Sequence, residues 1–315
     1  MQLLTAEGVG DVVPLDVARR VIKQHLLSGL CCMGERLRVV GDQATQVAIL
    51  GEASVGGRRY VGGRMYCPGP DRSEQTEFVY CRERGSPGID LLVTGRGLGE
   101  WRNAALVGLF LDAIPVAPRS VAVIGFGRQA QAAARSALDV LESPFQLRVS
   151  ARNHRTSEEV AHIVGCRRDR VTVHRSPSEA VRQSEVIIFA TSSATPVIDA
   201  DCVNANTVVI HIGEKKNGRS EIPAPLLSRA STVFVDCRTQ ALRESNGTAF
   251  TFVQPSSCQP LSKLLDRSRG HVGSSPLLVL NGVPGAEVAI ASIAVSDEMS
   301  SRPRVLRGSN HEKGA

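Results

Sequence analysis

Aromatic residues are scarce in this 315-residue chain: they make up 4% of it and include a single tryptophan. Proteins that bind single strands of nucleic acid interleave aromatic and basic side chains on one surface, so the net charge of +6 is not expected to serve such binding. The chain also lacks an apolar run of the roughly 20 residues that a membrane helix needs. Its first residues lack the basic and apolar regions of a signal peptide. We expect a soluble, cytoplasmic protein with neither a nucleic-acid nor a membrane partner.

The eight cysteines are scattered, and none of them shows the Cys-x-x-Cys or Cys/His spacing of a metal site. In a chain without a secretion signal, such cysteines are expected to be reduced and partly buried. We therefore expect no metal. The positive charge can belong to a solvated arginine-rich surface or to a site for small anionic ligands, and the motifs below favour the second interpretation.

The spacing of apolar residues predicts two kinds of domain, in keeping with about 150 residues per domain. Residues 5–28 have helical spacing, residues 37–93 hold short strands separated by glycine, proline and aspartate turns, and residues 99–114 have a strong helix pattern. From residue 116 strands and helices alternate strictly. This alternation predicts parallel βαβ units and an α/β fold with a doubly wound, Rossmann-type sheet.

The last part of the chain differs again. A strand, a turn and an apolar helix follow residue 275, and the Rossmann-type sheet does not need them, so we expect them to pack on the first domain. The prediction is an α+β domain of residues 1–115 joined by residues 275–299, and a Rossmann-type domain of residues 116–274. Residues 300–315 are polar and rich in arginine, which predicts a disordered tail.

A glycine motif opens the alternating domain. Residues 121–130 read as a buried strand, Gly-x-Gly-x-x-Ala and the start of a helix. Gly125 permits the tight turn, Gly127 lets a pyrophosphate approach the backbone, and Ala130 allows close packing of helix and strand. The phosphates would lie on free amides at the helix N-terminus, beside Arg128 and Gln129. A glycine turn without a ligand is the alternative, but the strand–turn–helix context favours a dinucleotide site.

The end of the second strand indicates which dinucleotide is bound. Enzymes that use NAD usually hold the adenosine ribose with an acidic residue at this point. Here the strand is followed by Arg152, Asn153, Arg155 and Thr156, which offer positive charge and hydrogen-bond donors to a 2′-phosphate. This pattern favours NADP over NAD, although a solvated basic loop is an alternative.

A short polar segment follows the fourth strand. Thr191, Ser192 and Ser193 lie where the loops at the carboxyl ends of parallel strands face the ligand crevice. We expect these hydroxyl groups to line the nicotinamide side of the site. An ordinary polar turn is the alternative interpretation.

Several segments, in the same order, resemble the ornithine cyclodeaminase/mu-crystallin family. The resemblance covers roughly residues 3–295 and includes the glycine motif at similar spacing. The other similar segments are the opening helices (3–26), LGEWRNAA (98–105), SEVIIFATSSATPVI (184–198), HIGEKKNGRSEI (211–222) and LNGVPGAEVAIAS (280–292).

The resemblance implies a homodimer and a discontinuous first domain for substrate binding and dimerisation, built from the N-terminal part and the C-terminal helix. It also implies a nicotinamide cofactor and a small amino-acid or imine substrate. The chemistry shared by the family is hydride exchange between the nicotinamide and the α-carbon of the substrate, through an imine. Asn103, in the Arg-Thr-Ala-Ala segment, and Gly282, in the closing segment, are further candidates for cofactor binding.

The chain departs from the family pattern at positions that carry chemistry. Arg64 stands where the family usually has a lysine; an arginine can orient a carboxylate but cannot deliver and retake a proton. Arg102 is kept. The aspartate of the cyclodeaminases corresponds to Glu214, which can serve as acid or base. We therefore predict Glu214 and Arg64 as catalytic residues, and Arg38, Arg64 and Arg102 as the binding site of the substrate carboxylate.

Each of these assignments has a simpler alternative. Arg38 alternates with apolar residues in a strand and can point to solvent, and Arg36 is a rival for its role. Arg64 can be a surface residue in a glycine-rich turn, and Glu214 can belong to a solvated charged loop. Arg102 lies near the start of a helix that should face the crevice, so it is the strongest candidate.

Three functions follow from these patterns. The first is an NAD(P)H-dependent oxidoreductase that reduces an imine (ketimine) or oxidises an amino acid at its Cα–N bond, in a specialised pathway. The second is a cyclodeaminase that releases ammonia with catalytic NAD. The third is a non-catalytic protein that binds a dinucleotide or a small ligand. Arg64 and Glu214 favour the first, because reduction of a preformed imine needs fewer proton transfers than cyclodeamination.

Overall fold

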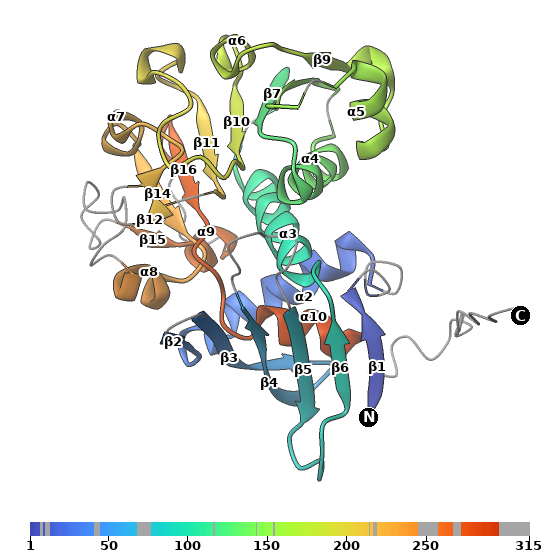
Figure 1. Cartoon of the computed structure of the whole chain (residues 1–315). Helices are drawn as coiled ribbons and strands as arrows, with labels where there is room; N and C mark the ends of the chain where they lie inside the picture. Colours follow the sequence, from blue (N-terminus) through green and yellow to red (C-terminus); the bar gives the residue numbers. More distant parts are fainter. Residues whose placement is uncertain are drawn as a thin grey trace, which may run out of the picture.

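Two β-sheets joined by a buried helix form the framework of the protein (Figure 1). The computed structural model describes residues 1–6, 9, 13–40, 45–67, 77–115, 117–142, 144–153, 155–213, 215–216, 219–244, 258–266 and 272–295. The first sheet has six strands, in the order β1-β6-β5-β4-β3-β2, and the second has eight, in the order β15-β14-β16-β11-β10-β7-β8-β9. A two-stranded hairpin of β12 (Lys215–Lys216) and β13 (Arg219–Ser220) accompanies them.

The six-stranded sheet is antiparallel except at one edge, where β1 and β6 are parallel. Two adjacent glycines with positive φ, Gly56 (57°) and Gly57 (77°), connect its longest pair of strands, as a tight hairpin requires. Its strands are β1 (Gln2–Thr5), β2 (Glu35–Val40), β3 (Thr45–Val55), β4 (Arg58–Tyr66), β5 (Glu77–Glu83) and β6 (Leu91–Thr94).

Strand β4 was not predicted. Its sequence VGGRMY suggests a turn, yet Gly62 and Gly63 lie inside the sheet, and a Cβ atom on Gly62 would stand 2.1 Å from the carbonyl oxygen of Tyr80. The glycines are needed because the neighbouring backbone is close. The interpretation of Arg64 as part of a glycine-rich turn is therefore wrong. The helix predicted from residue 5 was also placed too early, because residues 2–5 form β1 and the helix α2 is Leu15–Leu27.

Helices α2 and α10 (Ala286–Ile293) pack on the six-stranded sheet, next to the short helix η1 (Leu30–Cys32), and α3 (Leu98–Ala113) packs on these two helices. Every residue of α10 is buried, because this helix lies between strands β3–β5 and the helices α2 and α3. Helix α3 is buried along nearly its whole length and stands between the two sheets (Figure 1). Its first turn thus reaches the space between the two parts of the protein.

The eight-stranded sheet is parallel throughout. Its central strands are continuous apolar runs because helices cover both faces, and an apolar cluster lies on each side. The predicted α/β fold with a Rossmann-type sheet is confirmed. The strands are β7 (Ser120–Ile124), β8 (Gln146–Ser150), β9 (Val171–Val173), β10 (Val186–Phe189), β11 (Val208–His211), β14 (Thr232–Val235), β15 (Gln259–Pro260) and β16 (Pro276–Val279).

The helical segments that cover this sheet are α4 (Arg128–Val140), α5 (Ser157–Val164), α6 (Pro177–Val181), α7 (Ala224–Ser228), α8 (Arg238–Glu244) and α9 (Leu261–Leu265), with the short turns η3 (Arg168–Arg170) and η4 (Ala200–Cys202). Among the described residues, no helix combines the length and apolar composition needed to cross a bilayer.

Strand β16 corrects the predicted division of the chain. Residues 275–299 were expected to leave the Rossmann-type domain together, but β16 pairs with β11 on one side and β14 on the other. All four of its residues are buried, which explains its continuous apolar sequence. The chain leaves the eight-stranded sheet only after Val279. Helix α10, which begins at Ala286, then packs on the six-stranded sheet. The predicted tail, residues 300–315, lies outside the described residues.

Candidate functional site

The candidate site lies where three segments approach one another: the turn after β7, the first turn of α3 and the loop after β16. The chain adds β8 and β9 on one side of β7 and then places β10 on the other side. The strand order therefore changes direction between β7 and β10. In open parallel sheets, ligands bind at the carboxyl ends of the strands beside such a point.

The turn after β7 is shaped to receive an anion. Gly125 has φ +91°, and a Cβ atom there would lie 2.6 Å from the carbonyl oxygen of Ala190, so only glycine fits. Gly127 is the N-cap of α4, and no described side chain caps this end. A Cβ atom on Gly127 would meet no described atom within 4 Å. Ala130 is fully buried against the sheet. Free helix amides beside an uncovered glycine are what a pyrophosphate needs.

The two residues that follow Gly127 connect α4 with α3. The guanidinium of Arg128 donates to the carbonyl oxygen of Arg96 (2.6 Å) and lies 3.4 Å from Glu100 Oε1. Gln129 Oε1 accepts a hydrogen bond from the Asn103 side chain. These three predicted cofactor residues thus link the first turn of α4 to the first turns of α3 and the loop before it.

The end of β8 carries no acidic residue between positions 150 and 156. Arg152 lies 3.4 Å from Ser192 Oγ, and the guanidinium of Arg155 lies 5.8 Å from the ring centre of Phe126. Asn153 is exposed. The Thr156 hydroxyl accepts from the Glu159 amide and caps α5. The two arginines therefore lie beside the crevice, whereas Thr156 has a local structural contact.

The polar segment after β10 is held by its own hydrogen bonds. The Thr191 hydroxyl accepts from the Ser193 amide (3.1 Å), and the Ser193 hydroxyl donates to the Thr195 carbonyl oxygen (2.7 Å). The backbone amide of Thr191 donates to the buried carboxylate of Glu221 (2.6 Å), which also accepts from Gly213 (2.6 Å). Glu221 therefore ties the end of β10 to the end of β11.

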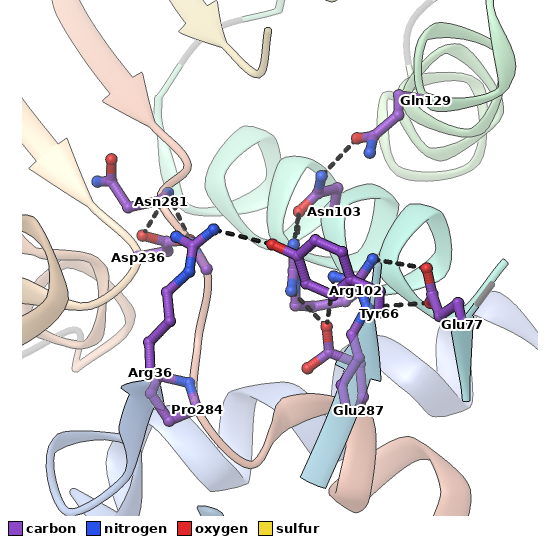
Figure 2. A network of polar contacts seen from close by, with 12 residues as sticks. Arg36, Tyr66, Glu77, Arg102, Asn103, Gln129, Asp236, Asn281, Pro284 and Glu287 are labelled. Atoms are coloured by element: carbon purple, nitrogen blue, oxygen red, sulfur yellow. Dashed lines mark hydrogen bonds and ion pairs between the residues drawn. The ribbon is translucent and has the colours of Figure 1, made fainter. Parts of the chain in front are cut away.

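Four charged side chains form a buried cluster between the two sheets, here called the arginine cluster: Arg64, Glu77, Arg102 and Glu287 (Figure 2). Arg64 donates to both oxygens of Glu77, at 2.9 and 2.8 Å, and to Glu287 Oε1 at 3.4 Å. Arg102 donates to the same Oε1 atom. The arginine side chains are 13% and 8% exposed and the glutamates 2% each, so these charges compensate one another inside the protein.

The cluster keeps Arg64 protonated. Burial by itself would lower the pKa of Arg64, but the carboxylates of Glu287 and Glu77 outweigh burial and raise this pKa above its usual value. Three of the five N–H groups of this guanidinium serve the two glutamates. Arg102 uses one N–H for Glu287 and two for the Asn103 side-chain oxygen. Each arginine therefore has N–H groups that donate to no other described residue.

Tyr66 and Arg36 extend the cluster (Figure 2). The guanidinium of Arg64 lies 4.7 Å from the ring centre of Tyr66, and Arg36 donates to the Tyr66 hydroxyl at 2.9 Å. Arg36 reaches this position from β2, where it lies opposite Ile49, which in turn lies opposite Arg64. Arg38 is exposed on the same strand. The structure thus places Arg36 beside the cluster, in the position that the sequence analysis assigned to Arg38.

The loop after β16 is fixed from β14. The buried carboxylate of Asp236 accepts hydrogen bonds from the backbone amides of Asn281 (2.9 and 3.0 Å), Gly282 (2.7 Å) and Cys237 (2.9 Å). Burial raises the pKa of Asp236, although these amides and the nearby Arg102 oppose the shift. Gly282 has φ +112°, and a Cβ atom there would lie 4.0 Å from Arg102 Nη1. Gly282 therefore lies beside Arg102.

Glu214, the predicted acid or base, lies outside the described residues. Glu77, Glu287 and Tyr66 were not predicted as site residues. Arg36 was named only as a rival of Arg38. One signal was available: Glu287 is the only charged residue between positions 277 and 295. A lone carboxylate in an apolar helix is rarely buried without a cation.

The sequence profile of the ornithine cyclodeaminase/mu-crystallin family matches residues 86–260. A Delta(1)-pyrroline-2-carboxylate reductase of Bacillus cereus is 29% identical over 73 residues, an alignment that covers 23% of this chain and 22% of that protein. The aligned part is thus about a fifth of the length of this curated relative.

Solved structures with the same fold cover nearly the whole chain. A probable ornithine cyclodeaminase from Bordetella pertussis Tohama I has a TM-score of 0.82 at 18% identity and covers 96% of this chain and 98% of that one. Delta(1)-pyrroline-2-carboxylate reductase of Thermococcus litoralis, in complex with NADH and L-proline, has a TM-score of 0.79 at 14% identity, with 95% and 97% covered. Iminosuccinate reductase of Paracoccus denitrificans, in complex with NAD+, has a TM-score of 0.78 at 17% identity, with 95% and 96% covered. At these identities the likeness establishes the fold alone.

Proposed function

Because the chain belongs to the ornithine cyclodeaminase/mu-crystallin family, we propose that it is an NAD(P)H-dependent oxidoreductase that acts at the Cα–N bond of a small amino acid or imine. In the reductive direction a hydride and a proton are added across the C=N bond of a ketimine and give an amine. The similarity to reductases of B. cereus and T. litoralis that act on Delta(1)-pyrroline-2-carboxylate supports this class of reaction. The departures at Arg64 and Glu214 favour a substrate of a specialised pathway.

The arginine cluster is the observation that carries the proposal. Two buried guanidiniums are held side by side by one carboxylate and keep donors on each side. A substrate carboxylate would take these donors in charge-assisted hydrogen bonds, which fix the α-carbon in one position. Arg64 stays charged throughout, so it orients the substrate and moves no proton.

The crevice residues fit a dinucleotide. Gly125 provides the turn, Gly127 leaves the amides of α4 accessible, and Arg152 and Arg155 can meet a 2′-phosphate, so we propose NADP rather than NAD as the preferred cofactor. When bound, the cofactor supplies the hydride. The proton comes from Glu214 or a water that it holds. Tyr66 is a second donor candidate, because its hydroxyl accepts from Arg36 and keeps its own proton.

The arginine cluster also ranks the alternatives. A cyclodeaminase needs a group beside the substrate that gives and retakes protons while ammonia leaves, and Arg64, bound to two glutamates, cannot do so. This argument places the cyclodeaminase second. A binding protein without turnover is third, because in such a protein the donors of Arg64 and Arg102 would have no role in a reaction.

We also propose that the chain forms a homodimer in the cytoplasm. Strand β2 is an edge of the six-stranded sheet, and it exposes Leu37 (46%), Val39 (66%) and Val40 (73%). Such an apolar edge is a natural pairing surface for a second copy.

The proposed location in the cytoplasm rests on the cysteines. All eight are free, which suits a reducing compartment.

The test is a stoichiometric assay. Purified protein is mixed with NADPH or NADH and a panel of cyclic imine carboxylates and keto acid–amine pairs, and the nicotinamide absorbance is followed. The proposal expects one NADPH oxidised per imine reduced, and a lower rate with NADH. Ammonia release from a diamino acid without net oxidation would support the cyclodeaminase, and binding without turnover the third candidate.

A further inference from the structure

Asn281 carries a side-chain amide that no other described residue engages. It lies in the loop that leaves β16, two residues after Val279. Both polar atoms of its side chain, Oδ1 and Nδ2, are buried, and neither has a hydrogen-bond partner among the described residues. About nine in ten buried polar groups in native proteins are paired, so a side chain with two unpaired groups points to a ligand.

The sheet order places Asn281 at one particular end of the crevice. The strands run in the order β8, β7, β10, β11, β16. The anion site follows β7, and Arg152 and Arg155, the candidates for the adenosine end, follow β8. A dinucleotide with its pyrophosphate beside Gly127 must therefore extend across β10 and β11 toward β16. Asn281 lies at the end where its reactive ring would meet the substrate site around Arg102.

The backbone of Asn281 is held in place. Its amide N–H lies 2.9 and 3.0 Å from the two oxygens of Asp236, and the next amide, of Gly282, donates to the same carboxylate at 2.7 Å. The positive φ of Gly282 fixes the turn that follows. One buried carboxylate accepts these three hydrogen bonds and makes the loop a rigid support, so the direction of the Asn281 side chain is set before a ligand arrives.

We propose that the Asn281 side chain binds the primary carboxamide of the nicotinamide ring. A side-chain amide offers two N–H donors and one acceptor oxygen, and the nicotinamide carboxamide offers the same set, so the two can form a reciprocal pair of hydrogen bonds. The proposed ligand of Arg64 and Arg102 is the substrate carboxylate. The uncharged side-chain amide of Asn281 is therefore left for an uncharged group, the carboxamide of the ring. This assignment rests on the proposed cofactor and adds a residue that selects the orientation of its ring.

The experiment is a calorimetric titration of the wild-type protein and the Asn281→Leu variant with three ligands. These are NADP+, its 3-acetylpyridine analogue, which lacks the carboxamide N–H donors, and 2′,5′-ADP, which lacks the ring. We expect Asn281→Leu to weaken NADP+ binding about tenfold, roughly 1.4 kcal/mol. The loss should be smaller for the analogue, and the affinity for 2′,5′-ADP should not change. Asn206→Leu, an exposed site at the amino end of β11, is the matched control and should leave all three affinities unchanged.

The outcomes separate this assignment from the proposed function. An equal loss for all three ligands would show that Asn281 only supports the loop, and an unchanged affinity for NADP+ would show that its amide meets no ligand. If the variant does not fold, the wild-type protein still decides: equal affinities for NADP+ and its analogue would overturn the assignment. Failure of the wild-type protein to bind any dinucleotide or 2′,5′-ADP would overturn the proposed function itself.

Discussion

Arg64 of strand β4 and Arg102 of helix α3 donate hydrogen bonds to one and the same atom, Oε1 of Glu287. Two buried cations repel each other, so this arrangement holds only because Glu287 lies between them and Glu77 neutralises the far side of Arg64. The result is a rigid pair of guanidiniums at the junction of two domains, with donors left over. We propose that this pair binds the carboxylate of a small substrate.

The Arg102→Ala variant tests the proposed substrate-binding role of the two arginines, of which Arg102 is the more buried. Hydrogen bonds to charged groups contribute about 1.5–3 kcal/mol, so we expect kcat/KM for the imine to fall by roughly 10- to 100-fold. NADPH affinity should change much less, because Arg102 reaches the residues of the glycine turn only through Asn103 and Gln129. Steady-state kinetics and calorimetry measure the two quantities. The exposed Arg182→Ala variant is the control, and unchanged kinetics in Arg102→Ala would reject the assignment.

Glu287→Gln should destabilise the protein. Breaking a buried ion pair leaves an uncompensated charge and costs about 3–5 kcal/mol of unfolding free energy. The comparison is Asp169→Asn, which removes the partner of Arg167 in a pair whose side chains are 82% and 61% exposed, and which should cost at most about 1 kcal/mol. Urea unfolding monitored by circular dichroism gives both values. Equal losses in the two variants would mean that Glu287 does not hold buried charges.

The parallel sheet and the glycine turn could be predicted because each βαβ unit and the Gly-x-Gly-x-x-Ala motif are written in consecutive residues. The arginine cluster could not. The partners of Arg64 are 13 and 223 positions away, and Glu287 is 185 positions from Arg102. The pairing of β4 with β5 brings Glu77 to Arg64, and the packing of α10 between β3–β5 and α3 brings Glu287 to both arginines. No local pattern encodes this packing.

Two other differences have similar causes. Arg36 and Arg38 alternate along β2 and therefore share a face, so periodicity alone cannot select between them. The position of Tyr66 on β4 decides in favour of Arg36, and β4 itself was hidden by its two glycines. Strand β16 was assigned to the first domain because its place between β11 and β14 is a matter of topology that an apolar run does not reveal.

Substitutions of the two glycines in the turn after β7 should have different effects, one on stability and the other on cofactor binding. Gly125→Ala puts a methyl group 2.6 Å from the Ala190 carbonyl oxygen at φ +91°, so we expect a loss of roughly 1–3 kcal/mol in unfolding free energy. Gly127→Val meets no described neighbour within 4 Å and has an extended backbone, so the fold should be retained. NADPH affinity should nevertheless fall about 100-fold or more, equivalent to about 2.7 kcal/mol. Thermal unfolding and calorimetry separate the two effects, and normal NADPH binding by Gly127→Val would contradict the anion site.

The buried His25 should make stability depend on pH. Its Nε2 atom lies 2.8 Å from the carbonyl oxygen of Pro284, and burial lowers its pKa below 6.5, although this hydrogen bond and Glu287 oppose the shift. The unfolded chain therefore binds more protons than the folded protein between the lowered pKa and 6.5. Stability should rise with pH across this window, and fall as the pH drops below 6.5, by up to about 1.4 kcal/mol per pH unit.

The measurement is urea unfolding at a series of pH values, for the wild-type protein and for His25→Gln, which keeps a donor near Pro284. The variant should lose most of the slope between pH 6.5 and the lowered pKa. Part of it will remain, because the pKa of His174 is also lowered, by burial and by Arg148. A slope that is identical in the two proteins would show that His25 does not titrate with folding.

Following the hydride is the direct test of reduction at a Cα–N bond. The protein is incubated with NADPH carrying deuterium at C4 and with a cyclic imine carboxylate, and the product is analysed by mass spectrometry. The account predicts one deuterium on the α-carbon of each product molecule and one NADP+ formed with it. An imine that is left unreduced, with no net change in the nucleotide, together with ammonia released from a diamino acid in a parallel incubation, would contradict this reaction.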